Sequence, residues 1–270
     1  MYSTRTVRRR APIPADVIEE PEVPREVPPA IYVIYEDAEH TQIFIDEIAR
    51  RGLPYKKWLI TGGFLDLNEK PPPGIFWCRF SPSASSRRHG HAIPYARAML
   101  TWLDVHGATV INGLSVFDLE MSKGIQTMHA LRAGLKVPRT YLVSGNSQQF
   151  IHGSKLGFSG HEPFYIKPDT GGSGMGVQRV ANCSALVDAV AKERVASLTS
   201  GRSTAVMQSC AGWTGEMHDD GVRRCFRAEF VGGMFLYLLH IVAMPGAFSL
   251  CPCDDGKITG VTLPFQLKIK

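Results

Sequence analysis

The sequence predicts two structured parts of different class: an α/β domain over residues 30–113 and an α+β domain over residues 114–270. In the first part, short β-prone runs alternate with amphipathic helices, the order typical of βαβ units with parallel strands. In the second part most expected elements are strands, and Gly232-Gly233 between two apolar runs predicts an antiparallel hairpin. Apolar residues make up 44% of the 270 residues, enough to build globular cores.

The elements of the first part follow from hydrophobic spacing. Apolar residues at 44, 45, 48 and 49 lie on one face of a helix, and Gly52 stands where such a helix would end. Apolar residues at 93, 96, 100 and 103 mark a second helix, followed by Gly107. The expected helices are Ala38–Arg51 and His91–His106, and the expected strands are Ile31–Tyr35, Lys57–Ile60, Ile75–Phe80 and Thr109–Asn112.

The second part begins with one expected helix, Phe117–Arg132, which Gly134 ends. Beyond residue 140 only Ala185–Arg194 has a convincing helical pattern. The remaining expected elements are strands, at Phe164–Lys167, Gly176–Val180, Thr204–Gln208, Cys225–Val231 and Met234–Ala243.

Composition excludes several classes of protein. Residues 1–29 contain six prolines, five arginines and five acids, so they predict a disordered tail. A net charge of +5 is too small to indicate nucleic-acid binding, and no apolar run is long enough for a membrane span. The N-terminus has no signal-peptide core, so we expect a cytoplasmic protein with reduced cysteines, including Cys251 and Cys253.

The most informative motif is Phe164-Tyr-Ile-Lys-Pro-Asp-Thr-Gly-Gly-Ser-Gly-Met-Gly-Val177. An expected strand carries Lys167 and is followed by four glycines in six residues. Glycines let backbone N–H groups approach phosphate oxygens, and a lysine neutralises phosphate charge. The alternative interpretation is a glycine-rich hairpin without a ligand. Neither the Walker pattern nor the dinucleotide-binding pattern is present.

Several motifs in this order resemble the ATP-grasp family, closest to its glutamate-ligase-like branch. The segment Val110–Thr140 contains a strand ending in Asn112, then Lys123, and then the turn residues Gly134, Pro138 and Thr140. The segments Ala205-Val-Met-Gln-Ser-Cys-Ala211 and Phe226-Arg-Ala-Glu-Phe-Val-Gly-Gly-Met-Phe-Leu-Tyr237 are similar to the family's adenine-binding strand and arginine-bearing strand pair. The resemblance covers roughly residues 30–253.

The resemblance implies an ATP-dependent ligase that joins a small carboxylate to an amine through an acyl phosphate. Two lysines and a glycine loop would bind the phosphates, one segment would border adenine, and one arginine would steady the transferred group. These residues are Lys123 and Lys167, then Gly171, Gly172, Gly174 and Gly176, then Gln208 and Cys210, and finally Arg227. For Arg227, a salt bridge on an exposed strand is the competing interpretation.

A basic loop in the first part is a second candidate site. Arg87, Arg88, His89 and His91 follow an expected strand, and ligands of open α/β sheets bind at the carboxyl ends of strands. The loop could receive an anionic substrate group. An exposed basic loop without a ligand explains the same residues equally well.

The resemblance also implies Mg²⁺, but ligands for it are not recognisable in the sequence. The family's acidic and asparagine ligands would follow Cys253, where only Asp254 and Asp255 occur before the chain ends at Lys270. We therefore expect a C-terminally incomplete ATP-grasp domain. The alternative function is a non-catalytic nucleotide-binding protein. Substrate identity and oligomeric state stay open.

Overall fold

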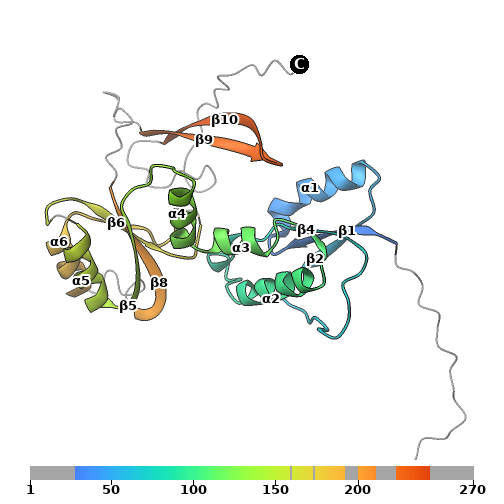
Figure 1. Cartoon of the computed structure of the whole chain (residues 1–270), viewed down its shortest axis with the longest axis horizontal. Helices are drawn as coiled ribbons and strands as arrows, with labels where there is room; N and C mark the ends of the chain where they lie inside the picture. Colours follow the sequence, from blue (N-terminus) through green and yellow to red (C-terminus); the bar gives the residue numbers. More distant parts are fainter. Residues whose placement is uncertain (1–27, 159, 173, 192–199, 211–222, 244–270) are drawn as a thin grey trace, which may run out of the picture.

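The computed structural model describes residues 28–158, 160–172, 174–191, 200–210 and 223–243. Within them lie two four-stranded sheets and a two-stranded sheet. Figure 1 shows the first sheet with its helices on one side of the molecule, the second sheet on the other, and helices α3 and α4 between them. The expected tail and Asp254, Asp255, Cys251 and Cys253 lie outside the described residues.

The first sheet is parallel, as predicted. Its strands are β1 (Ala30–Tyr35), β2 (Tyr55–Leu59), β3 (Gly74–Cys78) and β4 (Thr109–Ile111), in the order β2-β1-β3-β4. After β1 the chain adds β2 on one side, and it then crosses back to add β3 and β4 on the other side. The strand order therefore reverses between β1 and β3, and open α/β sheets bind ligands at the carboxyl ends of the strands at such a switch point.

Side chains of β1 alternate between two cores. Tyr32 and Ile34 pack with Phe76 against helix α2 (Ala92–Val105), whose Met99, Leu100 and Leu103 are buried. Val33 and Tyr35 pack on the opposite face against Ile45 of helix α1 (Ala38–Arg50). Both faces of this sheet are therefore covered, which explains why its central strands are continuously apolar.

The predicted helix Phe117–Arg132 is wrong, because the chain forms two helices there. Helix α3 (Leu114–Met121) ends at Ser122, which has an extended backbone, and helix α4 (Lys123–Arg132) starts immediately after it. The Ser122 hydroxyl accepts a hydrogen bond from the N–H of Ile125. The N–H of Lys123 donates to the carbonyl of Asp169, far away in the sequence. These two hydrogen bonds stabilise the interruption between α3 and α4. The spacing of apolar residues, from which the single helix was predicted, gives no information about such bonds.

Two elements between residues 140 and 160 were missed by the sequence patterns. Strand β5 (Thr140–Asn146) leads directly into helix α5 (Ser147–Gly157) through a capping box formed by Asn146 and Gln149. Gly153 and Gly157 weaken the helical pattern. In the structure a Cβ at these positions would lie 2.9 Å from Met207 and 2.5 Å from the Tyr141 ring, so both glycines allow α5 to approach the sheet closely.

The second sheet is antiparallel, in agreement with the predicted α+β class. It consists of β5, β6 (Phe164–Pro168), β7 (Gln178–Val180) and β8 (Ser200–Ser209), in the order β5-β8-β6-β7. Helix α6 (Cys183–Ala191) and α5 cover one face. The core on that face includes Phe158, Phe164 and Leu186, with the two phenylalanine rings stacked at 4.5 Å.

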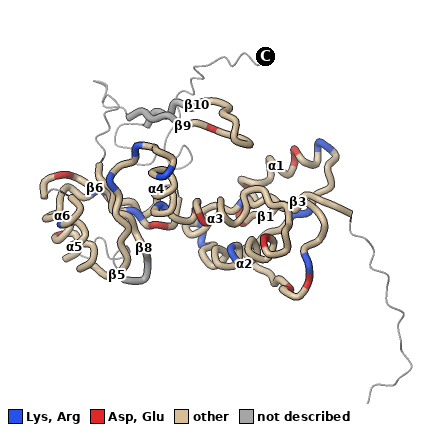
Figure 2. The backbone as a smooth tube through the Cα atoms, viewed as in Figure 1, with Lys and Arg blue, Asp and Glu red and all other residues tan. Residues whose placement is uncertain are grey.

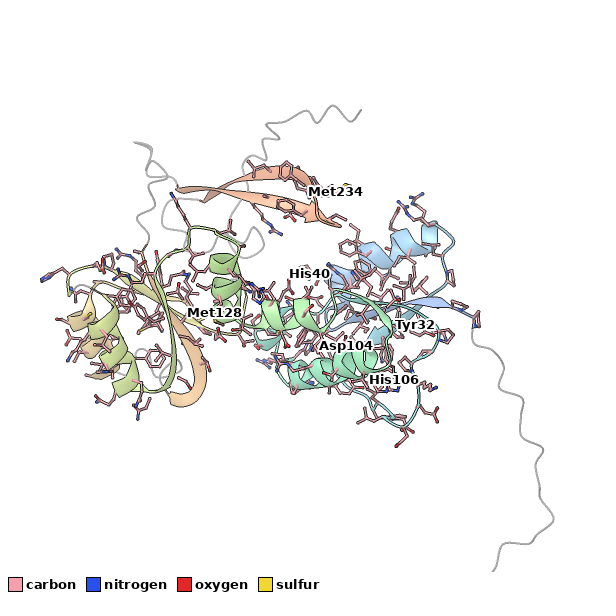
Figure 3. The ribbon with its side chains drawn as sticks, viewed as in Figure 1. Tyr32, His40, Asp104, His106, Met128 and Met234 are labelled. Carbon is pink, nitrogen blue, oxygen red and sulfur yellow. The ribbon has the colours of Figure 1, made fainter. Side chains whose placement is uncertain are left out.

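The predicted glycine hairpin is confirmed. Strands β9 (Arg223–Val231) and β10 (Met234–Ala243) pair antiparallel, and both Gly232 (φ 58°) and Gly233 (φ 79°) adopt the left-handed backbone that a tight turn requires. The hairpin lies above α4 in Figure 1, and Met234 at its turn is 69% exposed (Figure 3).

Two composition-based expectations can be compared with the described residues. Cys78, Cys183 and Cys210 are free thiols, and burial raises the pKa of Cys78 to about 11. No helix in the described ranges is long and apolar enough to cross a bilayer. Acidic residues of the described ranges lie on helices, loops and the β9–β10 hairpin (Figure 2), and the strands of the two four-stranded sheets contain none.

Candidate functional site

The register of the second sheet separates a core face from a polar face. Ile166, Ala205 and Met207 point into the core under α5 and α6. Because successive side chains of a strand alternate, Lys167 and Gln208 lie on the opposite face, and so does Thr140, the partner of Gln208 in the β5–β8 register. Leu142 on this face contacts the start of α4 at Gly124. The sheet therefore presents its polar residues toward the side where α4 lies.

Lys167 is held by a side chain of the neighbouring strand. Its Nζ donates to Oε1 of Gln208 over 2.6 Å, and it lies 5.5 Å from the centre of the Tyr165 ring. Burial lowers the pKa of Lys167 below its usual value, an effect opposed by nearby Cys210. The Lys167 ammonium is therefore partly desolvated, but it keeps a polar partner in Gln208. A charged group in such surroundings can bind an anion.

Lys123 ties helix α4 to the glycine loop. Its Nζ donates to the carbonyl oxygens of Pro168 (2.8 Å), Asp169 (3.3 Å) and Gly171 (2.9 Å). Three acceptors match the three N–H donors of a lysine ammonium. Burial lowers the pKa of Lys123; the charge of Asp169 opposes this effect, and the charge of Lys167 adds to it. The two lysines predicted from distant motifs therefore interact electrostatically at one place.

Further bonds fix the start of the glycine loop on the α3–α4 junction. Oδ1 of Asp169 accepts from the N–H of Gly124 over 2.8 Å, and the Thr170 hydroxyl donates to the carbonyl of Met121 over 2.7 Å. A carboxylate at the N-terminus of a helix is also favoured by the helix dipole. Asp169 and Thr170 were not singled out from the sequence, although both lie inside the motif that was.

The glycine loop itself makes two turns and contacts the first part of the chain. Met175 N–H donates to Gly172, and Val177 N–H donates to Gly174. Gly174 and Gly176 both have φ of 70°, in the left-handed region. A Cβ on Gly172 would lie 2.1 Å from Oγ of Ser83, in the short helix η1 (Pro82–Ser85). The loop therefore contacts the segment that follows β3 at Gly172.

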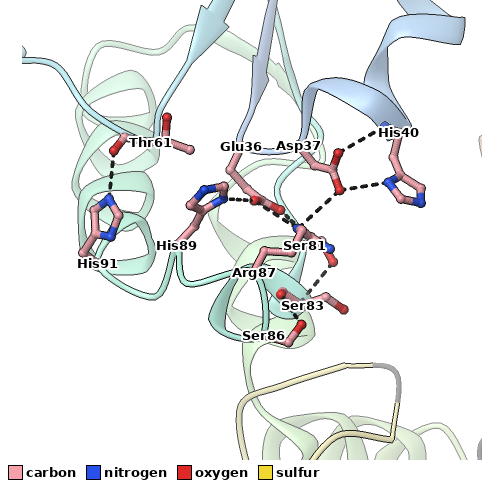
Figure 4. Close-up of polar contacts among 10 residues, drawn as sticks. All are labelled: Glu36, Asp37, His40, Thr61, Ser81, Ser83, Ser86, Arg87, His89 and His91. Carbon is pink, nitrogen blue, oxygen red and sulfur yellow. Dashed lines mark hydrogen bonds and ion pairs between the residues drawn. The ribbon is translucent and has the colours of Figure 1, made fainter. Parts of the chain in front are cut away.

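The basic loop after β3 surrounds a buried carboxylate (Figure 4). Glu36 directly follows β1, and its side chain has no exposed surface. It accepts hydrogen bonds from the Arg87 guanidinium and pairs with Nδ1 of His89 at 2.8 Å. Arg87 also lies 3.3 Å from Asp37, which caps α1. A buried carboxylate needs such partners, since an unpaired buried charge is costly.

The four predicted residues of this loop consequently have different surroundings. Arg87 and His89 are engaged with Glu36, and Nε2 of His91 donates to the carbonyl of Thr61 over 2.8 Å. Arg88 is exposed, has a left-handed backbone (φ 67°), and its guanidinium has no partner among the described residues. Glu36 was missed, although an acid placed directly after a buried apolar strand was a signal that could have found it.

The remaining predicted residues lie on β8 and the hairpin. Cys210 follows β8, is partly buried, and its N–H donates to the carbonyl of Pro163. Nε of Arg227 lies 2.6 Å from Oε1 of Glu229 on the same strand, and the Arg227 side chain is 59% exposed. This is the salt bridge expected under the competing interpretation of Arg227.

Comparison with known proteins identifies the architecture. No family model and no curated protein matches the sequence. Among solved structures, the chain is similar to the D-cycloserine synthetase DcsG (16% identity, TM-score 0.53), covering 78% of this chain and 67% of that one. It is also similar to a RimK domain ATP-grasp protein from Sphaerobacter thermophilus (17% identity, TM-score 0.53, 78% and 72% covered).

A third similar structure is D-alanyl-alanine synthetase A from Vibrio cholerae, at 10% identity and a TM-score of 0.54, covering 81% of this chain and 68% of that chain. The chain has the ATP-grasp fold. The mixed helix and sheet architecture predicted from the sequence is thereby supported, whereas the glutamate-ligase-like branch, the incomplete C-terminus and the residue boundaries of the domains stay predictions.

The ATP-grasp fold raises the question of a metal site. Within the described ranges, no three His, Cys, Asp or Glu side chains gather in a way that could hold a metal ion. The two acids singled out from the sequence, Asp254 and Asp255, are outside these ranges. The chemistry proposed below uses no step through a metal.

Removing the buried negative charge of Glu36 should destabilise the first sheet. We expect Glu36→Gln to lower the free energy of unfolding by about 1.5–3 kcal/mol, because Arg87 and His89 lose hydrogen bonds to a charged acceptor. Urea unfolding followed by circular dichroism measures this. The matched control is Glu47→Gln, which removes an exposed carboxylate paired with Arg50 and Arg51 and should change stability little. Equal effects of the two variants would contradict the assignment.

Filling the space at Gly172 should release the glycine loop. We expect Gly172→Val to be cleaved in the loop several-fold faster by subtilisin than the unchanged chain, because the side chain collides with Ser83. Gly160→Val is the control, since a Cβ there meets nothing within 4 Å. Adding Ser83→Gly to Gly172→Val should restore slow cleavage. A double variant that is cleaved as fast as the single one argues against the contact.

Proposed function

We propose that the chain binds ATP on the polar face of the second sheet and uses it to join a carboxylate to an amine. The observation that carries the proposal is the convergence of two part-buried ammonium groups, Lys123 and Lys167, at the start of one glycine loop. Cations and glycine backbone together are what a polyphosphate requires. The ATP-grasp fold, shared with ligases, supports the same function.

Both lysines must be protonated to bind phosphate. Burial lowers the pKa of each of them, and an added phosphate would raise the pKa of each, because an opposite charge favours the charged form. Nucleotide binding should therefore be strongest where both ammonium groups stay charged and should weaken as rising pH deprotonates them.

Lys123 has a second task in this proposal. Its three carbonyl acceptors belong to residues 168–171, so it holds the beginning of the glycine loop in place. A phosphate that binds Lys123 must share or replace one of these acceptors. Nucleotide binding and the position of the loop are consequently linked through one ammonium group, with Gly171, Gly172, Gly174 and Gly176 forming the covering segment.

The other proposed nucleotide contacts would come from β8 and from the hairpin. Gln208, next to Lys167, and Cys210, at the end of β8, would border the adenine ring. Arg227 would stabilise the transferred phosphoryl group, for which it would have to exchange its present partner Glu229.

The acyl substrate would bind at the carboxyl edge of the first sheet. Arg88 is the member of the basic loop whose guanidinium is exposed, whereas Arg87, His89 and His91 form the frame that holds the loop. The contact between Gly172 and Ser83 supports this placement, because it brings the glycine loop to the same segment.

The proposed reaction has two steps. A carboxylate oxygen of the substrate attacks the γ-phosphorus of ATP, and ADP leaves, which gives an acyl phosphate. An amine then attacks the acyl carbon, inorganic phosphate leaves, and a proton is lost from the nitrogen. The lysines and Arg227 contribute by neutralising and positioning the phosphates, the main requirements of phosphoryl transfer.

Loss of one ammonium group should weaken nucleotide binding. Lys167→Ala is expected to bind ATP about 10- to 100-fold more weakly, since charge-assisted contacts contribute about 1.5–3 kcal/mol each. Isothermal titration calorimetry measures this. Lys155→Ala on α5 removes an exposed lysine from the other side of the sheet and should bind normally. Unchanged affinity in Lys167→Ala would refute the assignment.

The ligase activity is tested by product formation. The full chain with ATP and Mg²⁺ is incubated with a panel of carboxylates and amines, and ADP and amide products are measured by mass spectrometry. We expect amide formation that Lys167→Ala reduces and Lys155→Ala does not. ATP binding without ADP release on any substrate pair would favour the alternative function, a non-catalytic nucleotide-binding protein.

A further inference from the structure

A chain of three hydrogen bonds runs across the polar face of the second sheet and ends at Lys167. The Thr140 hydroxyl donates to the carbonyl of Pro138 over 2.8 Å. Nε2 of Gln208 donates to that hydroxyl oxygen over 2.9 Å, and Lys167 Nζ donates to Oε1 of Gln208 over 2.6 Å. Thr140, Gln208 and Lys167 are each partly buried.

The strand register explains why these side chains meet. Thr140 and Gln208 are direct cross-strand partners in the β5–β8 pair. Gln208 is opposite Tyr165 in the β6–β8 pair, so Lys167 is its diagonal neighbour on the same face. A long side chain spans such a diagonal. The central strand β8 therefore places one amide between a hydroxyl on β5 and an ammonium on β6.

The chain of bonds has a fixed direction. Because the Thr140 proton is given to Pro138, the hydroxyl oxygen can serve only as an acceptor for Gln208. The Gln208 amide must then turn its NH₂ group toward Thr140 and its oxygen toward Lys167. The reverse orientation would place N–H donors against an ammonium group, which has no acceptor.

We propose that Thr140 is a positioning residue that fixes Lys167 for phosphate binding by orienting the amide of Gln208. The inference rests on the proposed function for the role of Lys167, but the hydrogen-bond chain exists independently of it. Without the hydroxyl, the NH₂ group of Gln208 loses its acceptor, and only the contact with Lys167 then holds the amide in this orientation. When the amide turns away, the ammonium loses a partner that stabilises its charged form.

The effect of Thr140 on Lys167 can be measured as a change in the pKa of Lys167. The charges and dipoles that face it are the Gln208 oxygen, the Tyr165 ring, the Cys210 thiol and the Lys123 ammonium. Changing Thr140 alters none of them except the first. A fall in the pKa of Lys167 after a change at Thr140 would therefore report on the Gln208 amide.

The experiment compares Thr140→Val, which keeps the size and β-branching of threonine, with Thr140→Ser, which keeps the hydroxyl. Competitive labelling of the full chain with acetic anhydride at several pH values, read by mass spectrometry, gives the pKa of Lys167. We expect a lower pKa in Thr140→Val and an unchanged one in Thr140→Ser, with Lys155 as internal control. Thr140→Ala gives the same test if valine is not accommodated.

A second variant tests whether Thr140 acts on Lys167 through Gln208. Gln208→Met should lower the pKa of Lys167, and adding Thr140→Val to it should change that pKa no further, because Thr140 acts through Gln208. Additive effects, an unchanged pKa in Thr140→Val, or a Thr140→Ser variant that behaves like valine would each overturn the proposal.

Nucleotide binding provides a separate measurement. With the ATP analogue AMPPNP and Mg²⁺, Thr140→Val should bind about 3- to 10-fold more weakly than the unchanged chain, and Thr140→Ser should bind normally. If the unchanged chain binds no nucleotide, the proposed function fails, whereas the pKa of Lys167 still decides whether the hydrogen-bond chain positions it.

Discussion

The structure depends on the junction between the end of β6 and the start of α4. There, carbonyl groups of Pro168, Asp169 and Gly171 surround the Lys123 ammonium, and the Asp169 side chain caps the helix at Gly124. One charge thereby satisfies backbone groups of a loop that has little regular structure of its own. The charge of Lys167 lies close enough to contribute to the lowered pKa of Lys123. The position of the loop therefore depends on the part-buried Lys123 cation, and the start of the helix depends on the neighbouring Asp169 carboxylate.

Much of the fold could be predicted because it rests on local patterns. The apolar run of β1, the helical spacing in α1 and α2, and the glycine pair between β9 and β10 each dictate structure within a few residues. Prediction from the sequence failed where contacts between residues far apart in the chain determine the local structure. The break at Ser122 depends on a bond to Asp169, and α5 keeps its glycines because the sheet lies against them.

The candidate site shows the same division. Lys123, Lys167 and the glycines were found through motifs, and in the structure the two lysines lie at the start of the glycine loop. The partners that hold them were not found: Asp169 and Thr170 at the loop, and Glu36 under the basic loop. These residues act by completing hydrogen bonds of other groups, so only their three-dimensional neighbours reveal them. The role of Thr140 likewise becomes visible through the register of β5 with β8.

The contact of Gly172 with Ser83 joins two parts of the chain that fold around separate cores. A loop that seats on a residue of the other part can do so only when both parts are at the correct separation. Any hinge motion between the two sheets would therefore also change the position of the loop. A molecule that increased the separation of the two sheets would also displace the loop from Ser83, without contacting any residue proposed to bind phosphate.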